Sequence, residues 1–271
     1  MIIKVLLINA PYHFPDPVVH RTEMLGLEYL AAGLRNAGHN VALLDPTVGP
    51  GQSVSPGLYY YGQSEAEIAD VIAKLRPDCV GISCHYSFAA ENAYRVADLV
   101  KRVSPETVVI MGGLFVSIFR DKPLKQCPSI DFCLIGEADN SLVDFLSKLS
   151  APCRAFEDID GLIYRNGDAV ITNKKCLFVQ DLDSLPFPAR DLWDMAPYLN
   201  GSREKRLYGL GNKPSLSILT SRSCPNRCSY CNMWLVHGSR WRGRSPDNVI
   251  AELEEILFKY KAEPHLSKID N

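Results

Sequence analysis

The sequence predicts an α/β fold built on a five-stranded parallel sheet, and two observations support this. From residue 1 to about 149, short β-rich runs alternate with segments of helical period. The β-rich runs are almost continuously apolar, which is typical of strands that are buried on both faces of a parallel sheet. Right-handed crossovers then place helices on both faces. We therefore expect a flavodoxin-like (Rossmann-like) sheet with strand order 2-1-3-4-5.

The strands are expected where apolar and β-branched residues cluster, at 4–9, 40–45, 79–83, 107–112 and 130–136. In an open parallel sheet the ligand crevice lies beyond the carboxyl ends of the strands, at the point where the strand order reverses. The loops expected to bind a ligand are therefore those that follow Asn9, Ser83, Gly112 and Gly136.

Helices are expected between these strands. The first helix stops at Gly38 and has one apolar face, formed by Leu27, Leu30, Ala31 and Leu34. A loop over residues 46–63, rich in Gly, Pro, Ser and Tyr, precedes the second helix. That helix has Ser64 as its N-cap and Glu67 in the capping-box position. Further helices are expected at 89–103, near residue 123 and at 141–149.

Residues 150–214 differ in character, and we expect a linker that contains a β-hairpin. Asn166–Gly167 suits the tight turn of this hairpin, and prolines punctuate residues 181–193. A strand at 216–220 then leads into a cysteine cluster. A helix is predicted after the cap Ser245–Pro246, with a buried face of Val249, Ile250, Leu253, Ile256 and Leu257.

Composition limits the classes of partner. The 271 residues are 46% hydrophobic and 22% charged with a formal charge of -2, so there is no basic footprint for nucleic acid. The short apolar run at the start contains a lysine and has no small-residue cleavage site, and no stretch has the roughly 18 to 20 apolar residues of a membrane helix. We expect a cytoplasmic protein without a membrane partner.

Nine cysteines are present, and six have no spacing that indicates a disulfide framework: Cys79, Cys84, Cys127, Cys133, Cys153 and Cys176. The other three, Cys224, Cys228 and Cys231, lie within eight positions. Thiolates suit zinc, copper(I) and iron–sulfur clusters. A closed zinc site needs a fourth ligand, for which His237 is the nearby candidate. A cubane cluster on three cysteines instead leaves one iron open to bind a substrate.

The spacing C-x3-C-x2-C, with Tyr230 before the last cysteine, resembles the signature of the radical S-adenosylmethionine enzymes. The resemblance implies that the three cysteines hold a 4Fe-4S cluster whose open iron binds S-adenosylmethionine. It also implies that Tyr230, Met233 and Arg242 lie near this cofactor, and that an external donor such as flavodoxin or ferredoxin supplies electrons. The basic runs 240–244 and 202–206 are otherwise expected to be solvated or to bind one anionic group.

Residues 1–149 are similar to the cobalamin-binding domain that is often fused to such enzymes, in "LLINAP", "PDCVGIS", "VIMGG" and "DFCLIGEAD". The resemblance implies cobalamin contacts at Asn9, Pro11, Ser83, Ser87, Gly112, Gly113, Gly136 and Glu137. The D-x-H-x-x-G sequence that supplies an axial histidine is absent, so we expect neither His13 nor His85 to bind cobalt. No G-x-G-x-x-G or Walker A sequence favours NAD or ATP, although another nucleotide or no ligand stays open.

Only 40 residues of the 271 follow Cys231, whereas a six-unit barrel needs on the order of 180. We therefore expect a cobalamin-binding domain (1–149), a linker (150–214) and the N-terminal part of a radical S-adenosylmethionine barrel (215–271). The resemblance implies cleavage of S-adenosylmethionine to a 5′-deoxyadenosyl radical and methylation of an unactivated carbon in a small molecule. A non-catalytic cobalamin-binding module and a cyclase or rearrangement enzyme are the alternatives.

Overall fold

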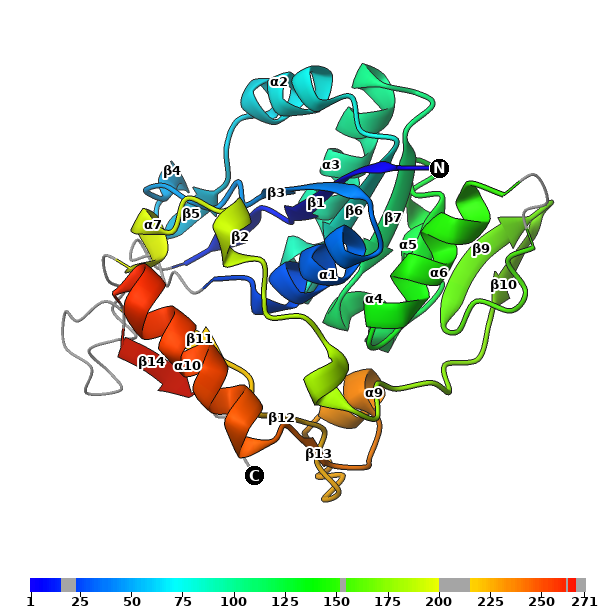
Figure 1. Ribbon diagram of the computed structural model, residues 1–271. Coiled ribbons are helices and arrows are strands. Elements are labelled where there is room, and N and C mark those ends of the chain that lie inside the picture. Colours follow the sequence, from blue (N-terminus) through cyan, green and yellow to red (C-terminus); the bar gives the residue numbers. More distant parts are fainter. Residues whose placement is uncertain (16–22, 152–154, 200–214, 262, 267–271) are drawn as a thin grey trace.

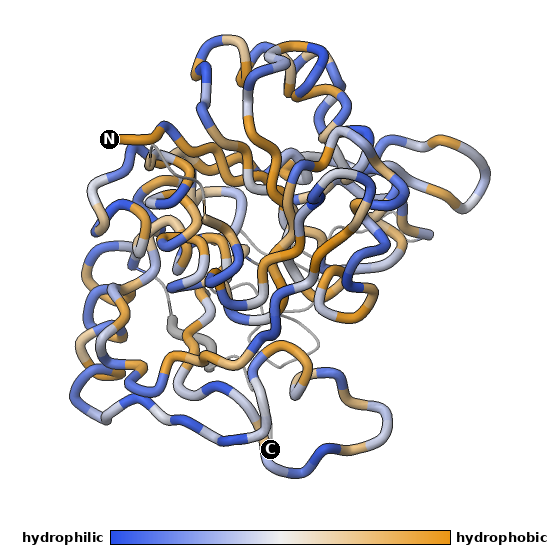
Figure 2. The backbone as a smooth tube through the Cα atoms, turned by 90° about the vertical axis from the view of Figure 1, so that its right-hand side faces the viewer, coloured by the Kyte–Doolittle hydropathy of each residue, from blue (hydrophilic) through white to orange (hydrophobic). Residues whose placement is uncertain are grey.

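The computed structural model describes residues 1–15, 23–151, 155–199, 215–261 and 263–266. A large sheet lies between two layers of helices, and the elements after residue 215 form a smaller group beside it (Figure 1). The strands at the centre of the molecule are mostly hydrophobic, whereas hydrophilic residues are frequent in the outer segments (Figure 2). Within the described ranges, none of the helices has the length and apolar character needed to cross a bilayer.

The central sheet has seven strands in the order β10-β9-β8-β7-β6-β1-β3. Five of them are parallel neighbours, namely β3 (Asn40–Leu44), β1 (Lys4–Asn9), β6 (Cys79–Ser83), β7 (Val108–Gly112) and β8 (Phe132–Leu134). Counted along the chain, this is the order 2-1-3-4-5. The predicted flavodoxin-like sheet is confirmed, and the strand order reverses between β1 and β6.

The hairpin of β9 (Leu162–Asn166) and β10 (Ala169–Thr172) extends this sheet. The strands pair antiparallel around the predicted turn, and β9 pairs antiparallel with β8. Leu162 and Ile163 are completely buried and contribute to the apolar clusters on opposite faces of the sheet. The hairpin therefore packs as part of the sheet, because both faces of β9 bury apolar side chains.

Helices cover the sheet on both faces (Figure 1). On one face lie α1 (Leu25–Asn36) and α6 (Asp139–Leu149). The other face is covered by α2 (Glu65–Leu75), α3 (Ala90–Val103), α4 (Leu114–Phe119) and α5 (Lys122–Gln126). The capping box of α2 is confirmed, since Ser64 Oγ accepts from Glu67 N and the Glu67 carboxylate accepts from Ser64 N. The short helix α4 was not predicted.

A second, three-stranded sheet lies where a loop was expected, so that prediction for residues 46–63 is wrong. Its strands are β2 (Tyr12–Phe14), β5 (Leu58–Tyr61) and β4 (Gln52–Ser55), all antiparallel. The β5 strand pairs with residues more than 40 positions earlier, and Tyr61 is buried beneath Tyr12 with their rings 5.3 Å apart. Aromatic packing between distant segments thus outweighs the local turn signals.

The C-terminal group is a strand–loop–helix–strand unit. β11 (Ser215–Ile218) pairs parallel with β14 (Glu263–Leu266), and α10 (Pro246–Tyr260) connects them. The helix begins as predicted, because Ser245 Oγ accepts from Asn248 N and Pro246 occupies the first turn. Between β11 and α10 lie β12 (Ser221–Arg222), α9 (Met233–His237) and β13 (Arg242–Gly243).

The predicted buried face of α10 is partly wrong. Ile256 is completely buried, but Ile250 and Leu257 are 52% and 47% exposed. The buried strip is centred instead on Glu252 and Ile256, which lie one helical turn apart. A pattern of apolar residues could not identify this strip, because the strip contains the charged residue Glu252. Ion pairs to Arg190 and Arg244 allow Glu252 to be buried.

Arg190 joins this C-terminal group to the large sheet domain. It follows α6 and the hairpin, in the short 3-10 helix Arg190–Leu192, and is completely buried. Its guanidinium donates to Glu252 and to the Ser217 carbonyl, both at 2.7 Å, and lies 3.8 Å from the Glu28 carboxylate of α1. A single cation thus contacts α1, β11 and α10, so these elements are held together by buried charge.

Candidate functional site

The carboxyl ends of β1, β6 and β7 place three of the predicted ligand residues side by side. Asn9 pairs in register with Ser83, and Ser83 pairs with Gly112. The following backbone continues these contacts, with Ala10 N donating to Ser83 O and Cys84 N donating to Gly112 O. The carboxyl ends of these three strands therefore lie next to one another, and Ser83 is partly exposed there.

Gly113 is required by the backbone at this edge. Its φ of 102° and ψ of -176° lie in a region that is essentially restricted to glycine. A Cβ atom at this position would lie 2.5 Å from the Cys84 carbonyl oxygen. The loops after β6 and β7 can therefore pack closely only if residue 113 has no side chain. Gly112 is less constrained, since a Cβ there would lie 3.8 Å from its nearest neighbour, Leu134 O.

Asn9 is tied into a buried polar network. Its amide nitrogen donates to Asp45 Oδ1 at 3.0 Å, and Asp45 also accepts from Thr47 and from the Tyr198 hydroxyl. Asn9 and Pro11 are both buried, whereas Ser87 is exposed at the start of a 3-10 helix. Among the predicted cobalamin contacts at this end of the sheet, the serines are thus more accessible than Asn9 and Pro11.

An aromatic cluster of Tyr12, Phe14, Tyr86 and Phe88 lies beside these loops. The rings of Tyr86 and Phe88 stack 4.9 Å apart at an interplanar angle of 8°, and both side chains are about half exposed. Tyr12 and Phe14 each lie 5.8 Å from the Phe88 ring. Exposed stacked rings at the carboxyl edge provide an apolar surface suited to a large planar ligand.

The cysteine loop lies in the expected connection between β11 and α10, where it is flanked by two short elements that were not predicted, β12 and α9. Its base is closed by the pairing of β12 with β13 and by Ser223 Oγ, which donates to Gly238 O at 2.6 Å. Cys231 N donates to Cys228 O, and all three cysteines are free and partly exposed. Tyr230 is 88% exposed. Across the described ranges, no three Cys, His, Asp or Glu side chains converge as a metal site.

His237, the alternative zinc ligand, points to a different partner. Its Nδ1 lies 2.8 Å from Glu137 Oε1, so the ring is oriented toward the loop after β8. The donors left on the cysteine loop are three thiols, a set that suits an iron–sulfur cluster better than a four-ligand zinc site.

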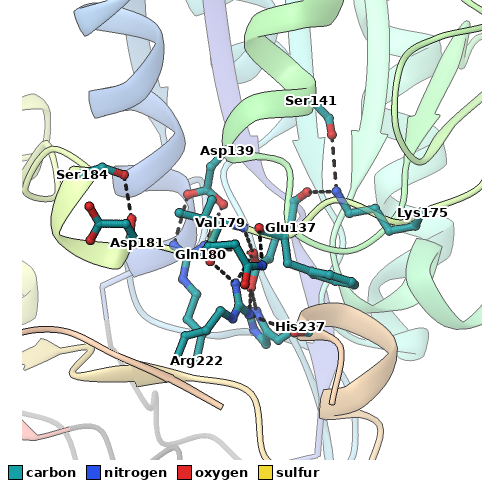
Figure 3. A network of polar contacts seen from close by, with 12 residues as sticks. Glu137, Asp139, Ser141, Lys175, Val179, Gln180, Asp181, Ser184, Arg222 and His237 are labelled. Carbon is teal, nitrogen blue, oxygen red and sulfur yellow. Dashed lines mark hydrogen bonds and ion pairs between the residues drawn. The ribbon is translucent and has the colours of Figure 1, made fainter. Parts of the chain in front are cut away.

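Glu137 is the centre of a buried polar network that the sequence did not predict (Figure 3). Its carboxylate accepts from Arg242 at 2.6 and 2.9 Å and from Val179 N at 3.1 Å. Burial by itself raises the pKa of Glu137, but hydrogen bonds from His237 and Arg242, together with the charge of Arg222, lower it to about 2. Glu137 is therefore ionised at neutral pH.

Arg222 and Asp139 complete this network. Arg222 donates to both oxygens of Asp139, at 2.7 and 3.1 Å, and its guanidinium lies over the Tyr29 ring. The signal that sequence reasoning overlooked is the acidic pair in "GEAD" directly after an apolar strand, together with an arginine on each side of the cysteines.

In the run 240–244, Arg242 and Arg244 bind carboxylates of this chain, whereas Arg240 is exposed. Arg242 is 5% exposed, and its terminal nitrogens are bonded to Glu137, Val179 and His237. Arg244 donates to Leu219 O and Asn248 and pairs with Glu252. Met233 is partly exposed at the start of α9. Run 202–206 and Cys153 lie outside the described residues.

Comparisons with known proteins agree with this arrangement. Residues 17–146 match the B12 binding domain family. The chain is 32% identical to an uncharacterized methyltransferase, PH0819, from Pyrococcus horikoshii over 96% of this chain and 51% of that protein. It is 26% identical to cytidylyl-2-hydroxyethylphosphonate methyltransferase from Streptomyces wedmorensis over 99% of this chain and 55% of that protein. The chain thus spans about half the length of these relatives.

The fold is similar to a solved structure of TsrM from Kitasatospora setae, a radical S-adenosylmethionine methyltransferase with cobalamin and a [4Fe-4S] cluster bound. The TM-score is 0.70 at 19% identity, over 98% of this chain and 48% of that chain. Residues 17–146 thus match the B12 binding domain family, and the chain as a whole is similar to cobalamin-dependent radical S-adenosylmethionine methyltransferases.

Proposed function

We propose that this chain is the cobalamin- and cluster-binding half of an enzyme that methylates an unactivated carbon of a small molecule. The observation that carries the proposal is the position of the C-x3-C-x2-C loop, whose two flanks are bonded to Glu137 and Asp139 at the carboxyl edge of the B12-binding sheet. Both relatives described above are methyltransferases by name, which favours methyl transfer over ring formation or rearrangement.

The donor set supports a cluster on Cys224, Cys228 and Cys231, because these free thiols are partly exposed on one loop. When bound, the cluster would supply the electron that cleaves S-adenosylmethionine, and cobalamin would carry the transferred methyl group. Tyr230 and Met233 remain the proposed contacts to S-adenosylmethionine. Arg242 is buried, and its bonds to Glu137 make it a support for the loop.

The carboxyl edge of the sheet supports a cobalamin site in three ways. The backbone at Gly112 and Gly113 carries no side chains, Ser83 and Ser87 are accessible, and the Tyr86–Phe88 stack adds an apolar surface. Asn9 and Pro11 would shape the site from beneath, and Gly136 and Glu137 lie at its far end, after β8. An external donor such as flavodoxin or ferredoxin would supply electrons. The eight described cysteines are free thiols, which supports a cytoplasmic location.

Anaerobic reconstitution with iron and sulfide tests the cluster. The chain should take up about four irons, and Cys228→Ala should abolish uptake. His237→Ala provides the contrast, because it should leave iron content unchanged if the thiols are the ligands. Tight binding of one zinc, lost in His237→Ala and without iron uptake, would contradict the proposal.

Hydroxocobalamin binding tests the front domain. We expect binding without a histidine ligand, because the D-x-H-x-x-G sequence that supplies one is absent. His13 Nδ1 also lies 3.1 Å from the Asn92 amide nitrogen, a partner within the domain. Electron paramagnetic resonance of the cobalt(II) form should therefore show no superhyperfine splitting from His13 or His85, and His13→Ala should give the same spectrum. No binding at all would favour a different ligand for this domain.

A non-catalytic cobalamin-binding module is the second candidate, favoured by the match of residues 17–146 to the B12 binding domain family. Anaerobic assays for 5′-deoxyadenosine distinguish the two. Product formed by this chain would exclude the module. Cobalamin binding with no product would exclude independent catalysis by this half.

A further inference from the structure

We propose that Glu137 is a positioning residue that clamps the cysteine loop onto the carboxyl edge of the sheet, and so sets the separation between the cluster and the cobalamin. The roles of the two bound groups rest on the proposed function. The clamp itself is made by the polypeptide and can be tested without either group.

The clamp contacts the cysteine loop on both sides. Arg222 precedes Cys224 by two residues, while His237 and Arg242 follow Cys231. Figure 3 shows Arg222 and His237 beside Glu137, in the segment directly after β8. Arg242 and His237 bind the Glu137 carboxylate, whereas Arg222 binds Asp139 and lies 3.8 Å from Glu137. Two residues of the sheet domain thus hold both ends of the loop.

The backbone is part of the same clamp. Glu137 N donates to Val236 O at 3.1 Å, which brings α9 directly against the end of β8. Gly136 permits this approach, because its φ is 72° and a Cβ there would lie 2.9 Å from Val236 O. Gly136 therefore allows α9 to approach β8 without a steric clash. Glu137 binds the cysteine loop through its ion pairs.

The segment after β8 is itself held in place from behind. Lys175 Nζ donates to the Glu137 carbonyl at 2.7 Å and pairs with Asp160 at the same distance. Ser117 Oγ of α4 accepts from Gly136 N at 2.9 Å. The segment after β8 is therefore fixed by its bonds to α4 and Lys175. The bonds from Glu137 to Arg242 and His237 then fix the cysteine loop relative to the sheet.

Burial makes this contact specific. Glu137, Arg222 and Arg242 are each 5% exposed, and Glu137 has a hydrogen-bond partner on both oxygens. A buried carboxylate bonded to a guanidinium fork has one preferred geometry, and removing its charge leaves the buried arginine unpaired. Glu137→Gln should therefore release the loop while preserving the size of the side chain.

Hydrogen–deuterium exchange of the chain without cofactors tests the clamp. In Glu137→Gln, amides at 232–241 should exchange at least tenfold faster, and those of β1 and β6 should keep their wild-type rates. Asp191→Asn is the matched control, because it removes another two-bond arginine–carboxylate pair, to Arg35, far along the chain from the cysteines. Unchanged exchange at 232–241 in Glu137→Gln would overturn the proposal.

If Glu137→Gln does not fold, Arg242→Lys tests the same contact, since lysine keeps the charge and loses the two-bond geometry. Its cysteine loop should also exchange faster, and an unchanged rate would overturn the clamp.

In protein loaded with both groups, Glu137→Gln should alter the magnetic coupling between cobalt(II) and the reduced cluster. Unaltered coupling would overturn the positioning role. If neither group binds to wild-type protein but the loop is still released, the proposed function fails while the clamp stands.

Discussion

Glu28 should make the chain less stable as the pH rises, and Glu28→Gln should remove this dependence. Glu28 is completely buried on α1, and its carboxylate has only weak partners: Arg190 Nε lies 3.8 Å away, and the Trp193 side chain lowers the pKa less than burial raises it. Burial, reinforced by the nearby charge of Glu23, raises its pKa from 4.5 to about 8. Arg190 lowers this pKa only in part, because its guanidinium lies 3.8 Å from Glu28 but 2.7 Å from Glu252.

The sign and size of the effect follow from the two pKa values. Between pH 4.5 and about 8, the folded chain holds one proton on Glu28 that the unfolded chain has released. The stabilisation is therefore fully present below pH 4.5 and is lost as the pH rises through 8. The slope is about 1.4 kcal/mol per pH unit, so wild type loses about 2 to 3 kcal/mol between pH 5.5 and 7.5 relative to Glu28→Gln.

Urea unfolding followed by tryptophan fluorescence measures this difference. The free energy of unfolding of Glu28→Gln minus that of wild type should increase by about 2 to 3 kcal/mol across this range. Glu91→Gln is the control, because Glu91 is exposed on α3 and its difference from wild type should stay flat. A flat difference for Glu28→Gln, or one that falls with pH, would show that Glu28 is ionised and paired with Arg190.

Two further substitutions test the sheet domain. Gly113→Ala should destabilise the chain by about 2 to 3 kcal/mol in the same urea assay and weaken cobalamin binding, because of its backbone conformation and the 2.5 Å approach to Cys84 O. Gly112→Ala, with 3.8 Å of space, should cost less, and equal costs would contradict the steric argument. Ser64→Ala should cost about 1 kcal/mol through loss of the α2 cap, whereas an unchanged urea midpoint would show that the cap contributes nothing.

The periodicity of the sequence determined the sheet domain to a large extent. Strands β1, β3, β6, β7 and β8 lie where continuous apolar runs occur, and their order is the flavodoxin-like one expected for a doubly wound sheet. The N-caps Ser64 and Ser245 were also predictable, since each acts on a backbone N–H only three residues away. The three cysteines were identifiable because ligand spacing is a property of the chain itself.

Long-range pairing lay beyond sequence reasoning. The β2–β5–β4 sheet, the buried strip of α10 and the clamp at Glu137 all depend on partners far apart in the chain, such as Glu137 and Arg242, 105 positions apart. In the sequence, Glu137 and Arg242 resemble separate cofactor contacts. Only the tertiary structure brings them together, because a buried carboxylate and a buried guanidinium are stable only when each neutralises the other.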